Sequence, residues 1–174
     1  MISETWKESN YAIVRSVLHP QLSKHLSSYL ILQRQVKLTA DEYKFIPPKD
    51  DVYGLWSDPQ INHANTWCKY GDTCMDTLFD IVTPVMNAVT GLDLIPTYSY
   101  SRIYAKGAEL LRHKDRFSCE ISTTINLGGP QWPIYLEPDT SKGYFEKDEK
   151  GIQRKYNSEF TKGIEVNLEP GDIM

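Results

Sequence analysis

The sequence contains no run of apolar residues that approaches the roughly 20 residues needed to cross a bilayer. Its first residues, Met-Ile-Ser-Glu-Thr-Trp-Lys, do not form a signal peptide. Cysteine is scarce: Cys68, Cys74 and Cys119 are an odd set without the close spacing of a paired motif. Reduced cysteines and the lack of a membrane segment predict a cytoplasmic protein with no membrane partner.

Clustered positive charge is missing as well. The 19 Lys and Arg residues are outnumbered by 23 Asp and Glu residues, and the two signs are interleaved along a chain of net charge −4. A nucleic-acid surface needs clustered Lys and Arg, so no nucleic-acid partner is expected. The chain also contains no Gly-rich phosphate-binding motif and no internal repeat. Its 174 residues are enough for one compact domain, residues 1–174, and few for two.

Two segments of the N-terminal half carry the apolar periodicity of helices. After a predicted strand at residues 11–18, Pro20 stands at the first position of a helix, where its missing N–H costs nothing. The apolar stripe of that helix comprises Leu22, Leu26, Tyr29 and Leu30. The second segment begins with Asp72 as a cap and ends at Gly91, with a kink or break expected at Pro84. Its apolar face comprises Met75, Leu78, Phe79, Val82, Val85, Met86 and Val89.

Between these two helices, residues 40–71 show no clean periodicity and are rich in turn-forming residues. An irregular stretch of this length is often a functional lid or a binding loop. Its aromatic residues equally allow a loop that only closes the edge of the core, and both interpretations stay open; they are Tyr53, Trp56, Trp67 and Tyr70. A zinc site built from His63, Cys68 and Cys74 is disfavoured, because their spacing matches no common zinc pattern.

The C-terminal half changes to short segments with the period-two alternation of strands. Strands are predicted at residues 98–105, 118–127, 132–136 and 163–168. The charged residues 137–160 between them predict a surface excursion. A helical buttress over residues 1–95 and antiparallel strands over residues 96–174 predict an α+β, mostly β protein. Its core is expected to be a double-stranded β-helix, or jelly roll.

The most informative short motif in this half is His113-Lys114-Asp115. Alternate side chains of a strand point to the same face, so an imidazole and a carboxylate two residues apart can hold one ion. Two of the three protein ligands of a non-haem Fe(II) site can be supplied in this way, which leaves positions open for a co-substrate and oxygen. On its own the motif is weak, because such a pair also occurs at the exposed end of a strand.

The residues around this motif strengthen it. Tyr104, Gly107, His113, Asp115 and Arg116 reproduce the spacing Tyr-x-x-Gly followed by His-x-Asp-Arg. Downstream, a predicted strand leads into the turn Pro170-Gly171-Asp172, in the same order. This set resembles the 2-oxoglutarate- and Fe(II)-dependent oxygenases of the prolyl 4-hydroxylase-like group. The resemblance spans roughly residues 96–174.

The resemblance implies roles for individual residues. His113 and Asp115 would be ligands of Fe(II), and Tyr104 would bind 2-oxoglutarate through its phenol, although a core aromatic is an almost equal interpretation. Thr124 and Asn126 would face the co-substrate, depending on the register of their strand. The implied reaction is hydroxylation of a peptidyl or free amino-acid side chain, with ascorbate as an optional cofactor. Arg116 is expected to form a salt bridge or to lie at the substrate rim.

One element of the resemblance is missing from the sequence. The family's second metal histidine follows the Pro-Gly-Asp turn, whereas this chain stops at Met174, and no other histidine is a natural substitute. We therefore expect a fragment that lacks the last strands of its jelly roll. Two alternatives stay open: a non-catalytic jelly-roll binding module or inactive fragment, and a cupin-like metalloenzyme of different chemistry, such as an isomerase. Substrate choice is expected to depend on the loops at residues 45–71 and 137–160.

Overall fold

The computed structural model describes residues 4–47, 49–116, 118–139, 141–142, 144–147, 153–157 and 162–174. Four helices are present in this part of the chain: α1 (Glu4–Ser9), α2 (Pro20–Glu42), α3 (Thr73–Asp76) and α4 (Phe79–Thr90). The strands are β1 (Trp67–Tyr70), β2 (Tyr100–Ile103), β3 (Ile134–Leu136), β4 (Tyr144–Lys147), β5 (Gln153–Asn157) and β6 (Ile164–Val166). Among the described residues, no helix combines the length and the apolar character needed to cross a membrane.

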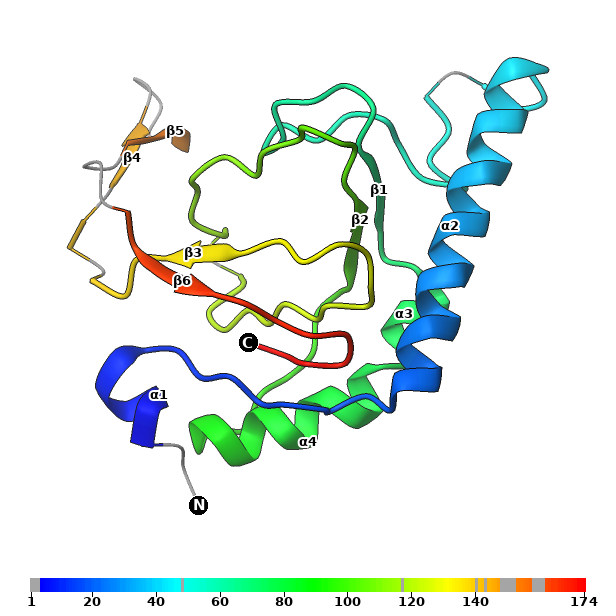
Figure 1. Ribbon diagram of the computed structural model, residues 1–174. Coiled ribbons are helices and arrows are strands. Elements are labelled where there is room, and N and C mark those ends of the chain that lie inside the picture. The colour runs from blue at the N-terminus through cyan, green and yellow to red at the C-terminus, as the bar shows by residue number, and fades with distance from the viewer. Residues whose placement is uncertain are drawn as a thin grey trace.

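Helix α2 begins at Pro20, as predicted, and lies along one side of the molecule (Figure 1). The preceding residue, His19, caps it by accepting a hydrogen bond from the backbone N–H of Gln21. The predicted apolar stripe faces inward, with Leu26 and Leu30 buried in the core. The C-terminal half of the helix buries Lys37 and Ala40, while apolar side chains outside the stripe, such as Leu32, are exposed.

The second predicted helix consists of two pieces, but the position predicted for the break is wrong. Asp72 caps α3 by accepting hydrogen bonds from the backbone N–H groups of Cys74 and Met75 at 3.0 Å and 3.2 Å. The chain leaves the helix after Asp76 and re-enters it at Phe79, and α4 then continues through Pro84.

Proline removes one intrahelical hydrogen bond, here the bond to the carbonyl of Asp80. Because Asp80 is exposed, water can satisfy that carbonyl, and the apolar side chains on either side keep the helix packed. Gly91 ends α4 in the left-handed conformation, at φ 74°, as the sequence predicts.

One core cluster joins the helices to the strands. It comprises Leu18, Leu26, Leu30, Trp67, Met75, Leu78, Val82 and Ile173. Trp67 is fully buried, and its indole N–H donates to the carbonyl of Tyr53 at 2.8 Å. Trp56 also packs against the cluster and donates its indole N–H to Asp41. These two tryptophans of the 40–71 segment therefore help to form the core, which supports the second interpretation of that segment.

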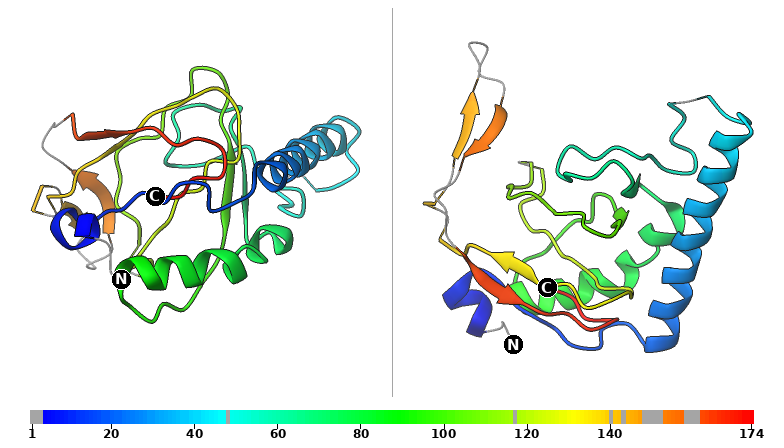
Figure 2. Two further views of the ribbon diagram at one scale, coloured as in Figure 1. Left: turned by 60° about the horizontal axis from the view of Figure 1, so that its bottom comes forward. Right: turned by 45° about the horizontal axis from the view of Figure 1, so that its top comes forward.

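The strands form three two-stranded antiparallel sheets in the described part of the chain: β1 with β2, β3 with β6, and β4 with β5. Strands β2, β3 and β6 lie within three of the segments predicted as strands. Strands β4 and β5, in the predicted surface excursion, form a hairpin that stands away from the rest of the molecule (Figure 2). The architecture is thus a mixture of helices and small antiparallel sheets.

The other two predicted strands, residues 11–18 and 118–127, are wrong as regular strands. Each is reduced to a single bridge with the C-terminal segment: Val14 and Ile125 both pair with Ile173. The C-terminal residues consequently lie between these two segments, near the middle of the molecule (Figure 1). Each of the two segments forms only one bridge with Ile173, so neither pairing extends into a regular strand.

The turn before this segment is anchored by Asp172, which is buried. Its carboxylate accepts hydrogen bonds from Arg15 and from the backbone N–H groups of Ser16 and Glu169. Gly171 adopts φ 98°, and a Cβ atom there would lie 2.4 Å from the carbonyl oxygen of Leu18. The predicted turn Pro170-Gly171-Asp172 is therefore confirmed, and it ties the two ends of the described chain together.

Candidate metal and co-substrate site

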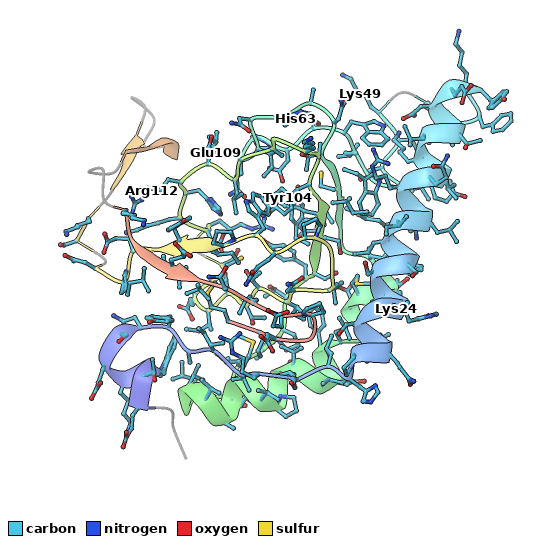
Figure 3. The ribbon with its side chains drawn as sticks, viewed as in Figure 1. Lys24, Lys49, His63, Tyr104, Glu109 and Arg112 are labelled. Atoms are coloured by element: carbon cyan, nitrogen blue, oxygen red, sulfur yellow. The ribbon has the colours of Figure 1, made fainter. Side chains whose placement is uncertain are left out.

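The segment that carries His113 is held in place by part of the 40–71 segment. Ile61 forms an antiparallel bridge with Leu110. Next to it, the backbone N–H of Asn62 donates to the carbonyl of Glu109 at 3.3 Å, and the side chains of the two residues are hydrogen-bonded as well. Figure 3 shows His63 and Glu109 on the same side of the molecule, beyond Tyr104. The chain therefore enters the His-x-Asp motif from a fixed position.

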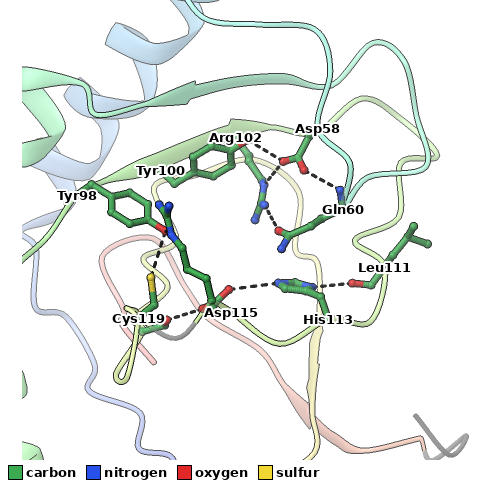
Figure 4. A network of polar contacts seen from close by, with 11 residues as sticks. Asp58, Gln60, Tyr98, Tyr100, Arg102, Leu111, His113, Asp115 and Cys119 are labelled. Carbon is green, nitrogen blue, oxygen red and sulfur yellow. Dashed lines mark hydrogen bonds and ion pairs between the residues drawn. The ribbon is translucent and has the colours of Figure 1, made fainter. Parts of the chain in front are cut away.

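His113 and Asp115 lie side by side, as the spacing predicts. The Nε2 atom of His113 is 3.7 Å from Oδ1 of Asp115 (Figure 4). The other ring nitrogen, Nδ1, is 2.7 Å from the backbone carbonyl oxygen of Leu111. A carbonyl oxygen can only accept, so Nδ1 carries a hydrogen and donates it. This bond orients the ring so that Nε2 faces the carboxylate, which is how ligating histidines are commonly held.

The separation within the pair can be compared with that of two ligands of one ion. Two donor atoms at about 2.1 Å from a common ion are about 3.0 Å apart when their bonds make a right angle and about 4.2 Å apart when they are opposed. At the separation of 3.7 Å, Nε2 and Oδ1 would contact one ion at an angle of about 125°, which is wider than the right angle between neighbouring ligands of an octahedral site. Within the described residues, no group of three or more His, Cys, Asp and Glu side chains is placed to hold a metal. The described chain thus brings His113 and Asp115 together, and their binding of a metal stays a prediction.

The second oxygen of Asp115 is bound from the segment that follows. The hydroxyl of Ser122 donates to Oδ2 of Asp115, which fixes the carboxylate beside His113. Thr124, two residues farther on, pairs with the C-terminal residue: the backbone N–H groups of Thr124 and Met174 each donate to the other's carbonyl at 3.0 Å. In extended chain, side chains two residues apart share a face, so Thr124 lies on the same face as Ser122.

Asn126 forms structural hydrogen bonds with the chain around the Pro-Gly-Asp turn. Its amide group donates to the carbonyl of Leu168, and its side-chain oxygen accepts from the backbone N–H of Gly128 at 2.9 Å. Its own carbonyl accepts from the N–H of Gly171 at 2.8 Å. These bonds hold the chain on both sides of the Pro-Gly-Asp turn. A contact of Asn126 with 2-oxoglutarate stays a prediction.

Tyr104 is half-buried and lies just after β2. Its ring packs edge-on against Trp132, with the ring centres 4.0 Å apart. Burial raises the pKa of its phenol, and the nearby guanidinium of Arg102 opposes that shift only in part. Tyr104 therefore keeps its proton at neutral pH and is able to donate a hydrogen bond to a carboxylate. The packing against Trp132 fits a core aromatic equally well, so both interpretations of Tyr104 stay open.

A polar network beneath the site was not predicted. The Nε atom of Arg102, on β2, is 2.7 Å from Oδ2 of Asp58, which also accepts from the phenol of Tyr100 at 3.1 Å. The other oxygen of Asp58 accepts from the backbone N–H of Gln60 at 2.8 Å. Burial of Asp58 opposes its ionisation, but these donors outweigh burial and hold its pKa below the usual value. The network ties the loop around Asp58 to β2 (Figure 4).

The only sequence signal for this network is weak. Arg102 is the single basic residue in the alternating segment that forms β2, and Asp58 precedes a proline in an irregular region. The two residues are 44 positions apart, and neither belongs to the motif that carries the resemblance. Their pairing depends on how the segment before β1 folds over β2, which no local pattern encodes.

The residue after Asp115 contacts two aromatic side chains. The guanidinium of Arg116 donates from Nε to the phenol oxygen of Tyr98 at 3.2 Å and from Nη2 to that of Tyr70 at 3.1 Å. The rings of Tyr70 and Tyr98 are stacked on each other, with their centres 4.4 Å apart. The phenol oxygen of Tyr98 also lies 3.2 Å from the sulfur of Cys119. Arg116 is thus held at the edge of the site by neutral partners.

Comparison with known proteins adds no assignment to this geometry. No family model, curated protein or solved structure matches the chain. What the site can do must consequently be argued from its own residues. Those residues are the His113–Asp115 pair and the hydrogen bonds that orient it.

Proposed function

We propose that the protein is an Fe(II)- and 2-oxoglutarate-dependent dioxygenase that hydroxylates a peptidyl or free amino-acid side chain in the cytoplasm. The observation that carries this proposal is the His113–Asp115 pair. Its Nε2 and Oδ1 atoms lie 3.7 Å apart, and a hydrogen bond from Nδ1 to the Leu111 carbonyl turns the Nε2 lone pair toward the carboxylate. Two electron-rich atoms that face each other repel unless a proton or a cation lies between them.

The bonds around this pair suit a metal site more than a surface ion pair. Each ligand is oriented by a further group, His113 by the carbonyl of Leu111 and Asp115 by the hydroxyl of Ser122. Such bonds fix the tautomer of the histidine and the rotation of the carboxylate, and they are typical of metal ligands. When bound, iron and 2-oxoglutarate would supply the oxidation chemistry. The chain's own task is to hold them and the substrate in place.

In this proposal the residues near the pair bind the co-substrate. Tyr104, which keeps its phenolic hydrogen, would donate it to a carboxylate of 2-oxoglutarate, and Thr124 would contact the co-substrate from the segment that carries Ser122. Asn126 is assigned to the co-substrate by the resemblance alone. The scaffold is proposed to be a double-stranded β-helix, of which the antiparallel pairs β1–β2 and β3–β6 would be parts.

A second candidate is a non-catalytic binding module on the same scaffold. The observation that favours it is the number of ligands: among the described residues, only two metal-ligating side chains meet at the site, and no group of three is found. Such a module would bind a small molecule or peptide next to His113 and would not consume 2-oxoglutarate. The two candidates therefore differ in a product that can be measured.

The test is the formation of succinate from 2-oxoglutarate by a completed protein that supplies the second metal histidine, with and without added Fe(II). The proposal predicts iron-dependent succinate, and it predicts that His113→Ala and Asp115→Ala abolish it while leaving the fold nearly intact, because both side chains are partly exposed. His25→Ala is the matched control, since His25 lies exposed on α2. Succinate formation that is undiminished in the His113 or Asp115 variant would remove these residues from a metal site. No succinate from the completed protein would favour the binding module.

A further inference from the structure

Arg116 is held in a fixed position at the edge of the candidate site. In addition to its hydrogen bonds to the phenols of Tyr70 and Tyr98, its guanidinium carbon lies 4.5 Å from the ring centre of Tyr98 and 5.7 Å from that of Tyr70. The two rings are stacked and so fix each other. An exposed arginine usually samples many rotamers, and ordering its side chain costs conformational entropy. The Arg116 side chain is already ordered in the ligand-free chain, so little further conformational entropy is lost when a ligand binds to it.

The charge of Arg116 is not neutralised by its partners. The partly buried phenol of Tyr98 has a raised pKa, because partial burial and the contact with Cys119 outweigh the effect of Arg116, so it stays uncharged at neutral pH. No ion pair of Arg116 with a carboxylate occurs within the ranges that the structure describes. The other site arginine differs: Arg102 is paired with Asp58 at 2.7 Å. A fixed guanidinium with a free charge is what binds an anion well.

Arg116 also retains the donors that such binding requires. A guanidinium has five N–H groups, of which one on Nε and one on Nη2 are used by the phenols. The sulfur of Cys119 is a further neighbour. At least two N–H groups on the terminal nitrogens consequently remain for a ligand. Arg116 directly follows Asp115 in the chain, and its guanidinium reaches the phenols of Tyr98 and Tyr70.

We propose that Arg116, hydrogen-bonded to the phenols of Tyr70 and Tyr98, binds a carboxylate group of the substrate. This inference rests on the proposed function, because it assigns the bound group to the molecule that is hydroxylated. A carboxylate is favoured over a phosphate group because one guanidinium offers one positive charge, and the neighbouring Asp115 repels a dianion. The planar fork of arginine matches a carboxylate in two parallel hydrogen bonds. The stacked tyrosines next to it favour an apolar, planar group beside the carboxylate.

The test uses benzoate as the probe and benzamide as its uncharged counterpart of the same shape. Binding is measured by calorimetry to the full chain after removal of metal, without iron or 2-oxoglutarate, so that no probe can bind to an ion. We expect benzoate to bind more tightly than benzamide. Arg116→Gln should weaken benzoate binding by at least about tenfold, which is the effect of losing a charge-assisted hydrogen-bonded pair. The same substitution should leave benzamide binding unchanged, and Arg116→Lys should restore part of the benzoate affinity.

Arg34→Gln is the matched control, because Arg34 also lies over an aromatic ring, that of Trp56 at 5.3 Å, but on helix α2. It should leave benzoate binding as in the parent chain. Equal benzoate affinity of the parent and Arg116→Gln, or equal affinity of the parent for benzoate and benzamide, would overturn the inference. Should Arg116→Gln fail to fold, the NMR signal of the Arg116 Nε–H in the parent decides: benzoate must shift it. Because the assay contains no iron, a lack of succinate formation would overturn the proposed function without affecting this result.

Discussion

Replacement of Asp58 by asparagine tests the network that ties the loop around this residue to β2. Asp58 is nearly inaccessible, with 2% of its side chain exposed, and Arg102 is 18% exposed. The asparagine side chain would keep an oxygen for the backbone N–H of Gln60, but it would carry no charge opposite the guanidinium. The variant therefore leaves a largely buried arginine without its counter-ion, while the shape of the side chain is unchanged.

The expected loss of stability follows from the burial of this pair. Removal of one partner from a fully buried ion pair costs about 3–5 kcal/mol. Since Arg102 retains some contact with water, we expect Asp58→Asn to lower the free energy of unfolding by about 2–3 kcal/mol. With a urea dependence of about 2 kcal/mol/M, this corresponds to a decrease of about 1–1.5 M in the unfolding midpoint.

The assay is urea unfolding followed by tryptophan fluorescence, which reports on the buried Trp67. The double variant Asp58→Leu with Arg102→Met removes both charges, so it should cost less than the sum of the two single variants. Additive effects of the two single substitutions would show that Asp58 and Arg102 do not interact. An unchanged midpoint for Asp58→Asn would refute the claim that this network fixes the loop to β2.

Two further predictions concern the turn that anchors the C-terminal segment and the response to acid. Gly171→Ala places a Cβ atom 2.4 Å from the carbonyl oxygen of Leu18, at φ 98°, so it should lower the thermal midpoint of unfolding. The control is Gly129→Ala, where φ is a similar 101° but a Cβ atom meets nothing within 4 Å, and its effect should be far smaller. Equal effects of the two substitutions would contradict the close approach at Gly171. The pKa of Asp172 is lowered, because its hydrogen bonds from Arg15 and two backbone N–H groups outweigh the opposing effect of burial. A lowered folded-state pKa means that the unfolded chain binds more protons, so the stabilisation is complete above the unfolded pKa of about 4 and is lost as the pH falls through the folded value. The free energy of unfolding should thus decline below about pH 5, and the decline should be less steep in the Asp172→Asn variant. A parallel decline in the two proteins would exclude Asp172 as a contributor to the pH dependence of stability.

The helices could be predicted because their signals are local. Pro20, Asp72 and Gly91 mark ends that side chains or φ angles determine within a few residues, and the apolar periodicity between them identifies the buried face. The break after Asp76 had no comparable signal, since Pro84 was the stronger helix breaker in the sequence. An alternation of apolar and polar residues, by contrast, predicts that a segment is extended but not which other segment it pairs with. Residues 11–18 and 118–127 therefore each form only a single bridge with Ile173. Tertiary packing, and not the local pattern, determines this pairing.

The same distinction holds for the candidate site. The approach of His113 to Asp115 follows from their spacing of two residues, so the sequence could predict it. The hydrogen bond from Ser122 to Asp115 connects residues 7 positions apart, and the one from Arg116 to Tyr70 connects residues 46 positions apart. Such contacts depend on how loops cross, and they were not predictable from the motif. They are also the contacts that orient the ligands and restrict what the site can bind.

The most direct test of the central claim is an anaerobic titration of the purified chain with Fe(II), followed by calorimetry. We expect one ion to bind per chain, through His113 and Asp115. Binding should be lost in His113→Ala and Asp115→Ala and retained in His25→Ala. If the ion is not bound, or is bound equally well by the His113 and Asp115 variants, then this pair is not a metal site.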